Sequence, residues 1–309
     1  MNYRHAFHAG NFADVVKHIG LICVLEKLAA KAKPFSYIET HAGRGRYNID
    51  GTEAQRSGEA EQGIQRLAAS ADASGVIARY LDLVRSFQPA AGTISVYPGS
   101  PLIARRLLRE SDRAQLCELQ PDELRMLRQN IDGDRRFAVH HRDGYQALDA
   151  LLPPMPRRGV VLIDPPYEQG NEFQRLVPAL ESAVRKWPTG IFMAWYPIKH
   201  RRELRAFYRQ LRDGGFGSVL LAELTIRPDD SRARLNGSGL VIIRPPWQLD
   251  RILSATWTEL VRRLGNEGAR CDIRWLSRAT SNTSSVDPVE ARSGGSAWAH
   301  GTRPGRSRR

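Results

Sequence analysis

The sequence contains few cysteines, and the three that it has are far apart. Cys23, Cys117 and Cys271 form neither a closely spaced CxxC pair nor a disulfide framework. No apolar run approaches the roughly 20 residues that a membrane-spanning helix requires. The first residues also lack the apolar segment of a secretory signal peptide. We therefore expect a cytoplasmic protein with no membrane segment and no zinc site of the CxxC type.

Acidic residues are scarce relative to basic ones. The 309 residues include 46 Lys and Arg but 33 Asp and Glu, which gives a formal net charge of +13. Six arginines and two acids in residues 277–309 account for +4 of this charge, so that +9 remains on residues 1–276. Such an excess is typical of proteins that bind a polyanion, most often nucleic acid. With 41% hydrophobic residues, the chain can also bury a full core.

Short apolar segments alternate with helical patterns over most of the chain. Strands are predicted over residues 35–39, 115–119, 137–140, 159–164, 190–195, 218–224 and 239–243. Helices are predicted over residues 12–31, 100–109, 121–130, 144–151, 171–186 and 200–213. This alternation indicates an α/β fold with a parallel, doubly wound sheet. The last two strands are expected to form an antiparallel hairpin at the sheet edge.

Composition divides the chain into three parts. Residues 47–93 are rich in Ala and Gln and are helical in pattern, which predicts a small helical insertion. The α/β domain then comprises residues 1–46 and 94–276. Residues 277–309 are rich in Ser, Arg and Gly and show no periodicity, so we expect a disordered tail.

Two helix starts are marked by capping residues. Asn11 is predicted to cap the first helix, with Asp14 as the acid of a capping box. Ser100 is predicted as the N-cap of the helix over 100–109, with Pro101 at its first helical position.

The most informative motif is Asp164-Pro165-Pro166-Tyr167, which directly follows an apolar strand. Ligands of open α/β sheets bind at the carboxyl ends of the strands. The Asp164 carboxylate and the Pro165 carbonyl can accept hydrogen bonds from a planar amino group and stabilise the charge that develops during attack. Tyr167 can stack on the ring that carries this group. The motif therefore indicates methyl transfer to a ring-conjugated amine.

Three further segments favour a nucleotide-type cofactor. Gly43 and Gly45 follow the first strand and allow the backbone to approach a ligand closely, with His41 where such turns usually have their first glycine. Glu118 ends the second strand, where an acid commonly binds ribose hydroxyls. Asp143-Gly144 follows the third strand, a usual place for contacts with an adenine ring.

Several segments together resemble the bacterial 23S ribosomal RNA adenine-N6 methyltransferase family of the RlmJ type. The similar segments are Tyr3–Asn11 with Asp14 and Lys17-His18, Thr40–Gly43 with Gly45–Tyr47, Tyr97–Pro101, Arg142–Gly144 and Asp164–Tyr167. They cover the chain up to about Leu276, and the N-terminal segment and the Thr-His-Ala-Gly turn are specific to this family.

The resemblance implies S-adenosylmethionine as methyl donor and a Rossmann-like sheet with a helical insertion. It also implies an extruded adenine of 23S ribosomal RNA as acceptor, in protein-free RNA or an early assembly particle. The implied cofactor contacts are His18, His41, Ser100, Glu118, Asp143, Gly144 and Asp164. Asp164 also contacts the target amino group, and Tyr3 lies near the substrate. Tyr3 and Arg4 offer a ring and a guanidinium that suit an extruded base and its flanking phosphates.

Other functions and other sites are compatible with parts of the sequence. The acceptor could instead be DNA adenine, guanine-N2 of ribosomal RNA or a protein glutamine, and a non-catalytic RNA-binding protein is a further alternative. The histidines lack zinc spacing, so no metal is expected. The motif Pro245-Pro246-Trp247 follows Arg244 instead of an acid and is interpreted as a loop. Basic side chains that could contact phosphates are Arg105, Arg106, Arg201 and Arg202.

Overall fold

The computed structural model describes residues 5–51, 56–70, 72–90, 92–168, 170–228 and 235–278. Tyr3, Arg4 and all of the expected tail beyond Arg278 lie outside these residues, and the expectations for them stay predictions. Within the described ranges, no helix has the length and apolar character needed to cross a membrane.

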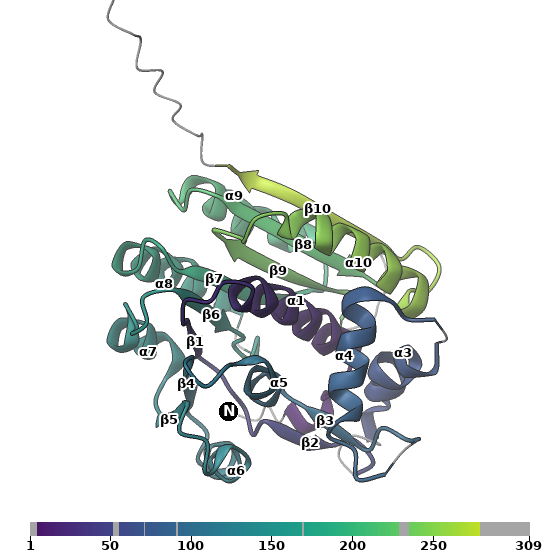
Figure 1. Ribbon diagram of the computed structural model, residues 1–309. Helices are drawn as coiled ribbons and strands as arrows, with labels where there is room; N and C mark the ends of the chain where they lie inside the picture. The colour runs from purple at the N-terminus through teal and green to yellow at the C-terminus, as the bar shows by residue number, and fades with distance from the viewer. Residues whose placement is uncertain are drawn as a thin grey trace, which may run out of the picture. The chain divides into compact units, whose positions relative to one another are not determined.

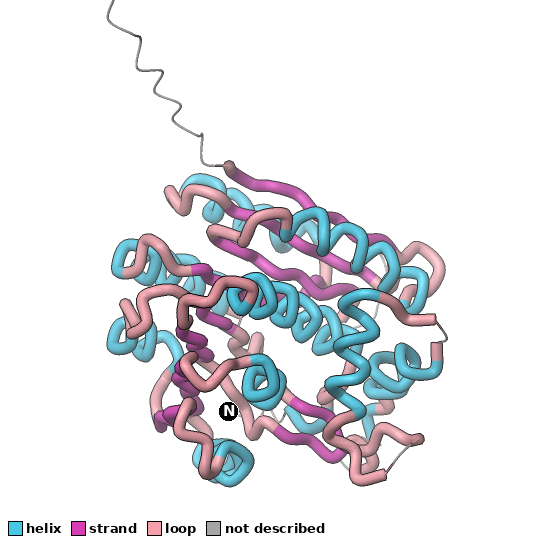
Figure 2. Tube along the Cα trace, in the orientation of Figure 1, coloured by secondary structure: helices cyan, strands magenta, loops and turns pink. Residues whose placement is uncertain are grey.

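One eight-stranded sheet forms the centre of the structure, in the strand order β10-β8-β9-β7-β6-β1-β4-β5 (Figures 1 and 2). Within this sheet, the neighbouring strands from β7 to β5 in this order are parallel, whereas β9 is antiparallel to both β7 and β8. The strands are β1 (Ser36–Glu39), β4 (Arg113–Glu118), β5 (Phe137–His141), β6 (Gly159–Ile163), β7 (Ile191–Ile198), β8 (Val219–Thr225), β9 (Gly237–Ile243) and β10 (Arg270–Ser277). The α/β fold and its seven predicted strands are thus confirmed.

The sheet edge differs from the prediction, because an eighth strand was missed. The strands β8 and β9 do pair antiparallel, but β10 pairs with the outer side of β8 and takes the edge position. The helix α10 (Leu249–Leu264), also unpredicted, precedes it. In β10, Arg270, Asp272 and Arg274 alternate with apolar residues that pack on the core, a period of two that is typical of a strand with one buried face.

Helices cover both faces of the sheet. One apolar cluster contains the inward residues of α1 (Phe12–Ala29), α5 (Ser100–Leu107), α6 (Pro121–Ile131) and α10. The other contains those of α7 (Gly144–Leu151), α8 (Glu172–Lys186) and α9 (Arg205–Asp213), and the 3-10 turn η3 (Arg201–Leu204) precedes α9. The two clusters are the layers that a doubly wound sheet requires.

The first helix is buried on all sides. Every residue from Phe12 to Leu25 is buried, because α1 lies between the sheet and the helices α4 (Gly75–Arg85), α5 and α10. Asn11 caps it as predicted, since its side chain accepts a hydrogen bond from the Asp14 amide at 2.9 Å. Polar side chains on this helix are therefore removed from water and require partners inside the protein.

The segment predicted as a helical insertion contains η2 (Glu61–Gln65), α3 (Arg66–Ala69) and α4. Two unpredicted short strands, β2 (Arg46–Asn48) and β3 (Val96–Pro98), pair antiparallel on either side of it. The following helix α5 is confirmed, but its N-cap lies one residue earlier than predicted. Gly99 is its N-cap, and Ser100 is its first residue, because the Ser100 hydroxyl donates a hydrogen bond to the Glu39 carboxylate instead of capping the helix.

Candidate active site

A cavity of about 730 Å³ lies where the strand order reverses. The strands β1 and β6 are neighbours at this point. The next strand after β1 in the sheet, β4, lies on the far side of β1, and the next strand after β6, β7, lies on the far side of β6. Crevices at such a switch point, at the carboxyl ends of the strands, are the usual ligand sites of open α/β sheets. The volume suits a cofactor together with part of an acceptor.

The glycine turn after β1 forms one wall. Gly43 and Gly45 both have left-handed backbone conformations, with φ of 61° and 78°, which explains the need for glycine at both positions. The Gly43 amide donates a hydrogen bond of 2.8 Å to Glu118. Gly45 does not line the cavity. Its carbonyl instead accepts a hydrogen bond from the Gly99 amide at 2.8 Å, so it fixes the turn against the start of α5.

Glu118 and Asp143 place two carboxylates on the same side of the cavity. Glu118 accepts hydrogen bonds from the amides of Gly43 and Gln120, one on each oxygen, and each oxygen can accept one more. Asp143 caps α7 through Oδ1, which accepts from the amides of Tyr145 and Gln146. Both carboxylates are thereby oriented while retaining capacity for a ligand.

Gly144 allows α7 to approach the turn after β1. A Cβ atom at this position would lie 2.4 Å from the Thr40 carbonyl oxygen and 2.7 Å from an imidazole carbon of His41. His41 packs edge-on against Tyr145, with 5.6 Å between ring centroids, and its Nδ1 lies 2.7 Å from the Thr40 hydroxyl. His41 thus replaces the usual glycine without blocking the cavity.

Two histidines that line the cavity are neutral. Burial lowers the pKa of His41 to about 4. Burial, together with the charge of Lys17, lowers the pKa of His18 to about 3. The His18 ring stacks on Tyr97, and its Nδ1 lies 2.8 Å from the Tyr97 hydroxyl. Both imidazoles therefore act as neutral hydrogen-bonding groups at physiological pH.

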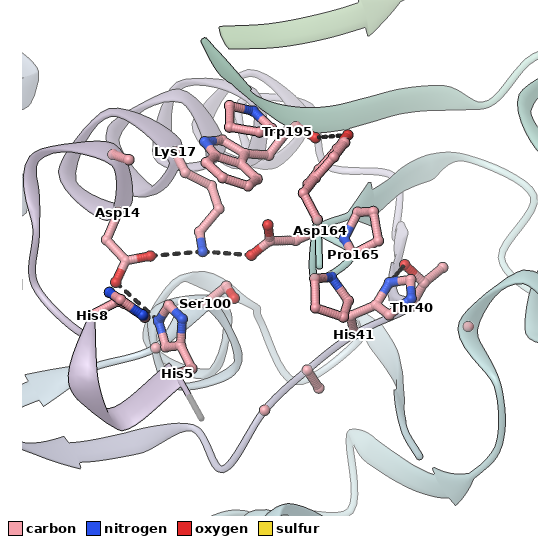
Figure 3. Close-up of a pocket in the computed structure, with 18 of the residues that line it drawn as sticks. His5, His8, Asp14, Lys17, Thr40, His41, Ser100, Asp164, Pro165 and Trp195 are labelled. Carbon is pink, nitrogen blue, oxygen red and sulfur yellow. Dashed lines mark hydrogen bonds and ion pairs between the residues drawn. The ribbon is translucent and has the colours of Figure 1, made fainter. Parts of the chain in front are cut away.

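Asp164 is held by a buried ion pair with Lys17 (Figure 3). The Lys17 ammonium lies 2.6 Å from Asp164 Oδ2 and 2.8 Å from Asp14 Oδ1, and its side chain is 5% exposed. Burial alone would lower the pKa of Lys17, but the charges of Asp14 and Asp164 raise it well above its ordinary value. The other Asp164 oxygen, Oδ1, has no hydrogen-bond donor among the described residues.

The acid Asp14 completes this group of charges. Its Oδ2 accepts a hydrogen bond from the Gly10 amide at 3.1 Å and lies 3.0 Å from His5 Nε2. Burial would raise the pKa of Asp14, yet the charges of His5 and Lys17 hold it well below its ordinary value. The acid of the predicted capping box therefore bonds Gly10 and Lys17, rather than the backbone of the Asn11 cap.

Aromatic rings form the wall beside Asp164. The Tyr167 hydroxyl donates a hydrogen bond of 2.8 Å to the Trp195 carbonyl, and the two rings meet edge to face at 5.6 Å. The Trp195 indole N–H donates to the Ser238 hydroxyl at 2.9 Å. Pro165 and Pro166 line the same region. Because each ring is fixed by its polar atom, the wall beside Asp164 is a rigid aromatic surface.

The cavity brings together most of the residues singled out in the sequence. It is lined by His18, His41, Gly43, Ser100, Glu118, Asp143, Gly144, Asp164, Pro165 and Tyr167. Sequence reasoning did not assign a role to Lys17, Trp195 or Lys199, which also line it. Only the spacing of Lys17 from Asp14 on one helix could have indicated a pair. No group of three or more potential metal ligands occurs among residues in the described ranges.

The strand order and the cavity define a Rossmann-like methyltransferase. A family model described as "Ribosomal RNA large subunit methyltransferase D, RlmJ" matches residues 32–277, and the chain belongs to this family. The relative of Escherichia coli, named "Ribosomal RNA large subunit methyltransferase J", is 42% identical over 89% of this chain and 99% of that protein. The relative of Haemophilus influenzae with the same name is 39% identical over 90% and 99%.

Superposition on a solved structure also supports the fold. The crystal structure of a protein from Legionella pneumophila superimposes with a TM-score of 0.79 at 34% identity, and covers 86% of this chain and 98% of its own. The fold and the family are therefore established independently of the motif. The family identifies an enzyme that uses a methyl donor and acts on RNA.

A buried acid beneath the cavity generates a prediction for stability. Glu39 is fully buried between the hydroxyls of Tyr37 and Ser100. Burial raises its pKa from 4.5 to about 8, although the hydrogen bonds from Ser100 and Tyr37 and the charge of Lys17 oppose the shift. Between these two pH values the folded state holds a proton that the unfolded state has released, so that stability falls as the pH rises.

Replacement of Glu39 by Gln should remove this pH dependence. The free energy of unfolding of the wild type should fall by up to about 1.4 kcal/mol per pH unit through this window. The Glu39→Gln variant should show a flatter profile in urea denaturation at pH values between 4.5 and 8. Parallel profiles for the two proteins would contradict the assignment.

Glu223 provides a control of opposite sign. It is also fully buried, but the hydroxyls of Tyr196 and Tyr208 and the charges of Arg274 and Arg201 outweigh burial and lower its pKa. The ionised form of Glu223 therefore stabilises the fold, and Glu223→Gln should lower stability across the same window.

Proposed function

We propose that this protein transfers a methyl group from S-adenosylmethionine to the N6 amino group of an adenine in 23S ribosomal RNA. The observation that carries the proposal is the position of Asp164. It stands at the switch point of the sheet, in the same cavity as the glycine turn and Glu118, and one of its carboxylate oxygens has no donor among the residues that the structure describes. Family membership supports RNA as the acceptor.

The cofactor half of the cavity suits the groups of S-adenosylmethionine. Glu118 offers two oriented oxygens to ribose hydroxyls, and Asp143 with Gly144 lies where an adenine ring would pack. Because Gly144 has no side chain, the start of α7 can pack directly against Thr40 and His41 at the wall of the cavity. When bound, S-adenosylmethionine supplies a methyl group activated by a sulfonium. His18, His41 and Ser100 complete the proposed contacts.

The acceptor half positions the target amine. We assign Asp164 Oδ1 and the Pro165 carbonyl as acceptors for its two N–H groups, an arrangement that favours the pyramidal, positively charged nitrogen formed during attack. Lys17 acts as a positioning residue, because its ammonium fixes Oδ2 and leaves Oδ1 to the substrate. Tyr167 and Trp195 provide flat surfaces for the extruded base.

The N-terminal residues Tyr3 and Arg4 extend this proposal to the substrate. They precede η1 (His5–Phe7), where His5 lies against Asp14 and lines the cavity. We propose that Tyr3 stacks near the extruded adenine and that Arg4 contacts a flanking phosphate.

The direct test is methyl transfer in solution. Purified protein is incubated with tritiated S-adenosylmethionine and protein-free 23S ribosomal RNA, and the modified nucleoside is then identified. We expect N6-methyladenosine at one position. Transfer of the label to guanine-N2, to DNA or to a protein glutamine would show that the protein is a methyltransferase with a different acceptor. Donor binding without transfer to any acceptor would favour a non-catalytic RNA-binding protein.

Asp164→Asn should reduce transfer by at least about a hundredfold, although an amide oxygen can still accept a hydrogen bond. The Lys17 ammonium requires an acceptor, so the amide oxygen should turn toward Lys17 and the NH₂ group toward the target amine. Two donors would then face each other. Single-turnover transfer measures the effect, and calorimetry should show donor binding close to that of the wild type. Activity above about a tenth of the wild type would contradict this role.

Glu118→Gln should raise the dissociation constant of the donor by roughly tenfold or more, about 1.4 kcal/mol per decade. The amide keeps only one acceptor oxygen for the two backbone N–H groups and the ribose. RNA affinity without donor should barely change. Asp122→Asn, which removes one charge from an 85% exposed side chain on α6, serves as the matched control. Equal donor affinity in both variants would leave Glu118 without a role in binding.

A further inference from the structure

An exposed lysine stands at the edge of the cavity. Lys199 directly follows β7 and lines the cavity on the side of Trp195 and Pro197. Its backbone is fixed, because its carbonyl accepts a hydrogen bond of 2.8 Å from the Asn236 amide group. Its ammonium makes no hydrogen bond or ion pair with any residue that the structure describes, in contrast to the buried Lys17. A cation on a fixed stretch of backbone is thus available beside the proposed acceptor site.

A row of arginines continues from this lysine along η3 and α9. Arg202, Arg205, Arg209 and Arg212 are all exposed. They recur at i, i+3, i+7 and i+10, the spacing that places residues on one helical face. The opposite face buries Leu204, Phe207 and Leu211 in the core. We call these four residues the arginine stripe.

The direction of α9 leads the stripe away from the cavity. β7 ends at Ile198, on the cavity edge of the sheet. β8 begins at Val219, which lies level with Phe192 near the start of β7, because both residues pair with the same residue of β9. η3 and α9 therefore run from the cavity edge toward the opposite edge. At 1.5 Å per residue, the stripe is about 15 Å long, which is enough to face several phosphates of one strand.

The stripe differs from other arginines that the sequence suggested for phosphate contacts. Arg201 pairs with Glu223 at 2.7 Å, Arg105 pairs with Asp134 at 3.0 Å, and Arg106 stacks over the Phe87 ring. By contrast, no side chain of the stripe has an ion pair or hydrogen bond to another described residue. The exposed acids of the same segment are Glu203 and Asp213, so positive charge prevails along this face.

We propose that Lys199 and the arginine stripe bind consecutive phosphates of the RNA strand adjoining the target adenine. The inference rests on the proposed function and extends it, since it assigns the path of the strand outside the cavity. Guanidinium groups without protein partners can each neutralise a phosphate and release its counterion, which makes the affinity dependent on salt. Lys199 would hold the phosphate nearest the extruded nucleotide.

The test compares two double variants that remove equal charge. Arg202→Gln/Arg205→Gln removes the half of the stripe nearest the cavity. Arg185→Gln/Arg251→Gln is the control, because both side chains are exposed, make no hydrogen bond or ion pair with another described residue, and lie near the opposite edge of the sheet. Filter binding of protein-free 23S ribosomal RNA is measured over a range of salt concentrations, together with calorimetry of donor binding.

The stripe variant should bind this RNA roughly tenfold more weakly at 0.1 M salt, and the slope of log K against log salt should become shallower by about 1.5. Donor affinity and the rate at saturating RNA should match the wild type. Lys199→Gln should raise KM for RNA in the same way. The control variant should keep the wild-type slope.

Equal losses in the stripe and control variants would show an effect of net charge alone and overturn the inference. An unchanged slope in the stripe variant would overturn it as well. The wild type is assayed for methyl transfer to RNA in parallel. If it is active, either of these outcomes overturns the inference but leaves the proposed function intact. A wild type that transfers no methyl group to RNA would instead overturn the proposed function.

Discussion

The ion pair between Lys17 and Asp164 is the interaction on which the site depends. A charged ammonium with 5% of its side chain exposed is stable only because two carboxylates contact it, at 2.6 and 2.8 Å. One carboxylate, Asp14, belongs to the same helix as Lys17, and the other follows β6, 147 residues away in the sequence. The pair therefore joins the central helix to the switch point of the sheet. It holds Asp164 through Oδ2 and leaves Oδ1 without a donor among the described residues.

This arrangement separates two tasks within one cavity. Backbone amides orient Glu118 and Asp143 on the side proposed for the cofactor, whereas a side-chain cation orients Asp164 on the side proposed for the acceptor. These backbone amides have fixed positions, because they belong to the glycine turn, the residues that follow β4 and the N-terminus of α7. The acceptor side is fixed by Lys17 and by the rings of Tyr167 and Trp195.

Much of the fold could be predicted because its signals are local. Seven strands, the cap at Asn11 and the Asp-Pro-Pro-Tyr motif are all visible in short segments of sequence. The role of Lys17 could not be predicted, since it depends on a partner far along the chain. Ser100 was wrongly predicted as an N-cap because its hydroxyl bonds Glu39 at the end of β1, which is far away in the sequence. Arg201 and Arg202 are neighbours in sequence, yet only the structure shows that one meets Glu223 and the other meets solvent.

The pairing of β2 with β3 closes the helical segment at its base. Tyr47 lies opposite Tyr97, so the chain enters and leaves the helical segment at adjacent points. A loop whose ends are already joined can change length at little entropic cost, about 0.6 kcal/mol for each doubling. Glu59, which this segment presents to His8 and Asn11 at the cavity, can therefore be replaced or repositioned with the whole segment. The length of this segment can thus change without altering the strand order of the sheet that carries Glu118 and Asp164.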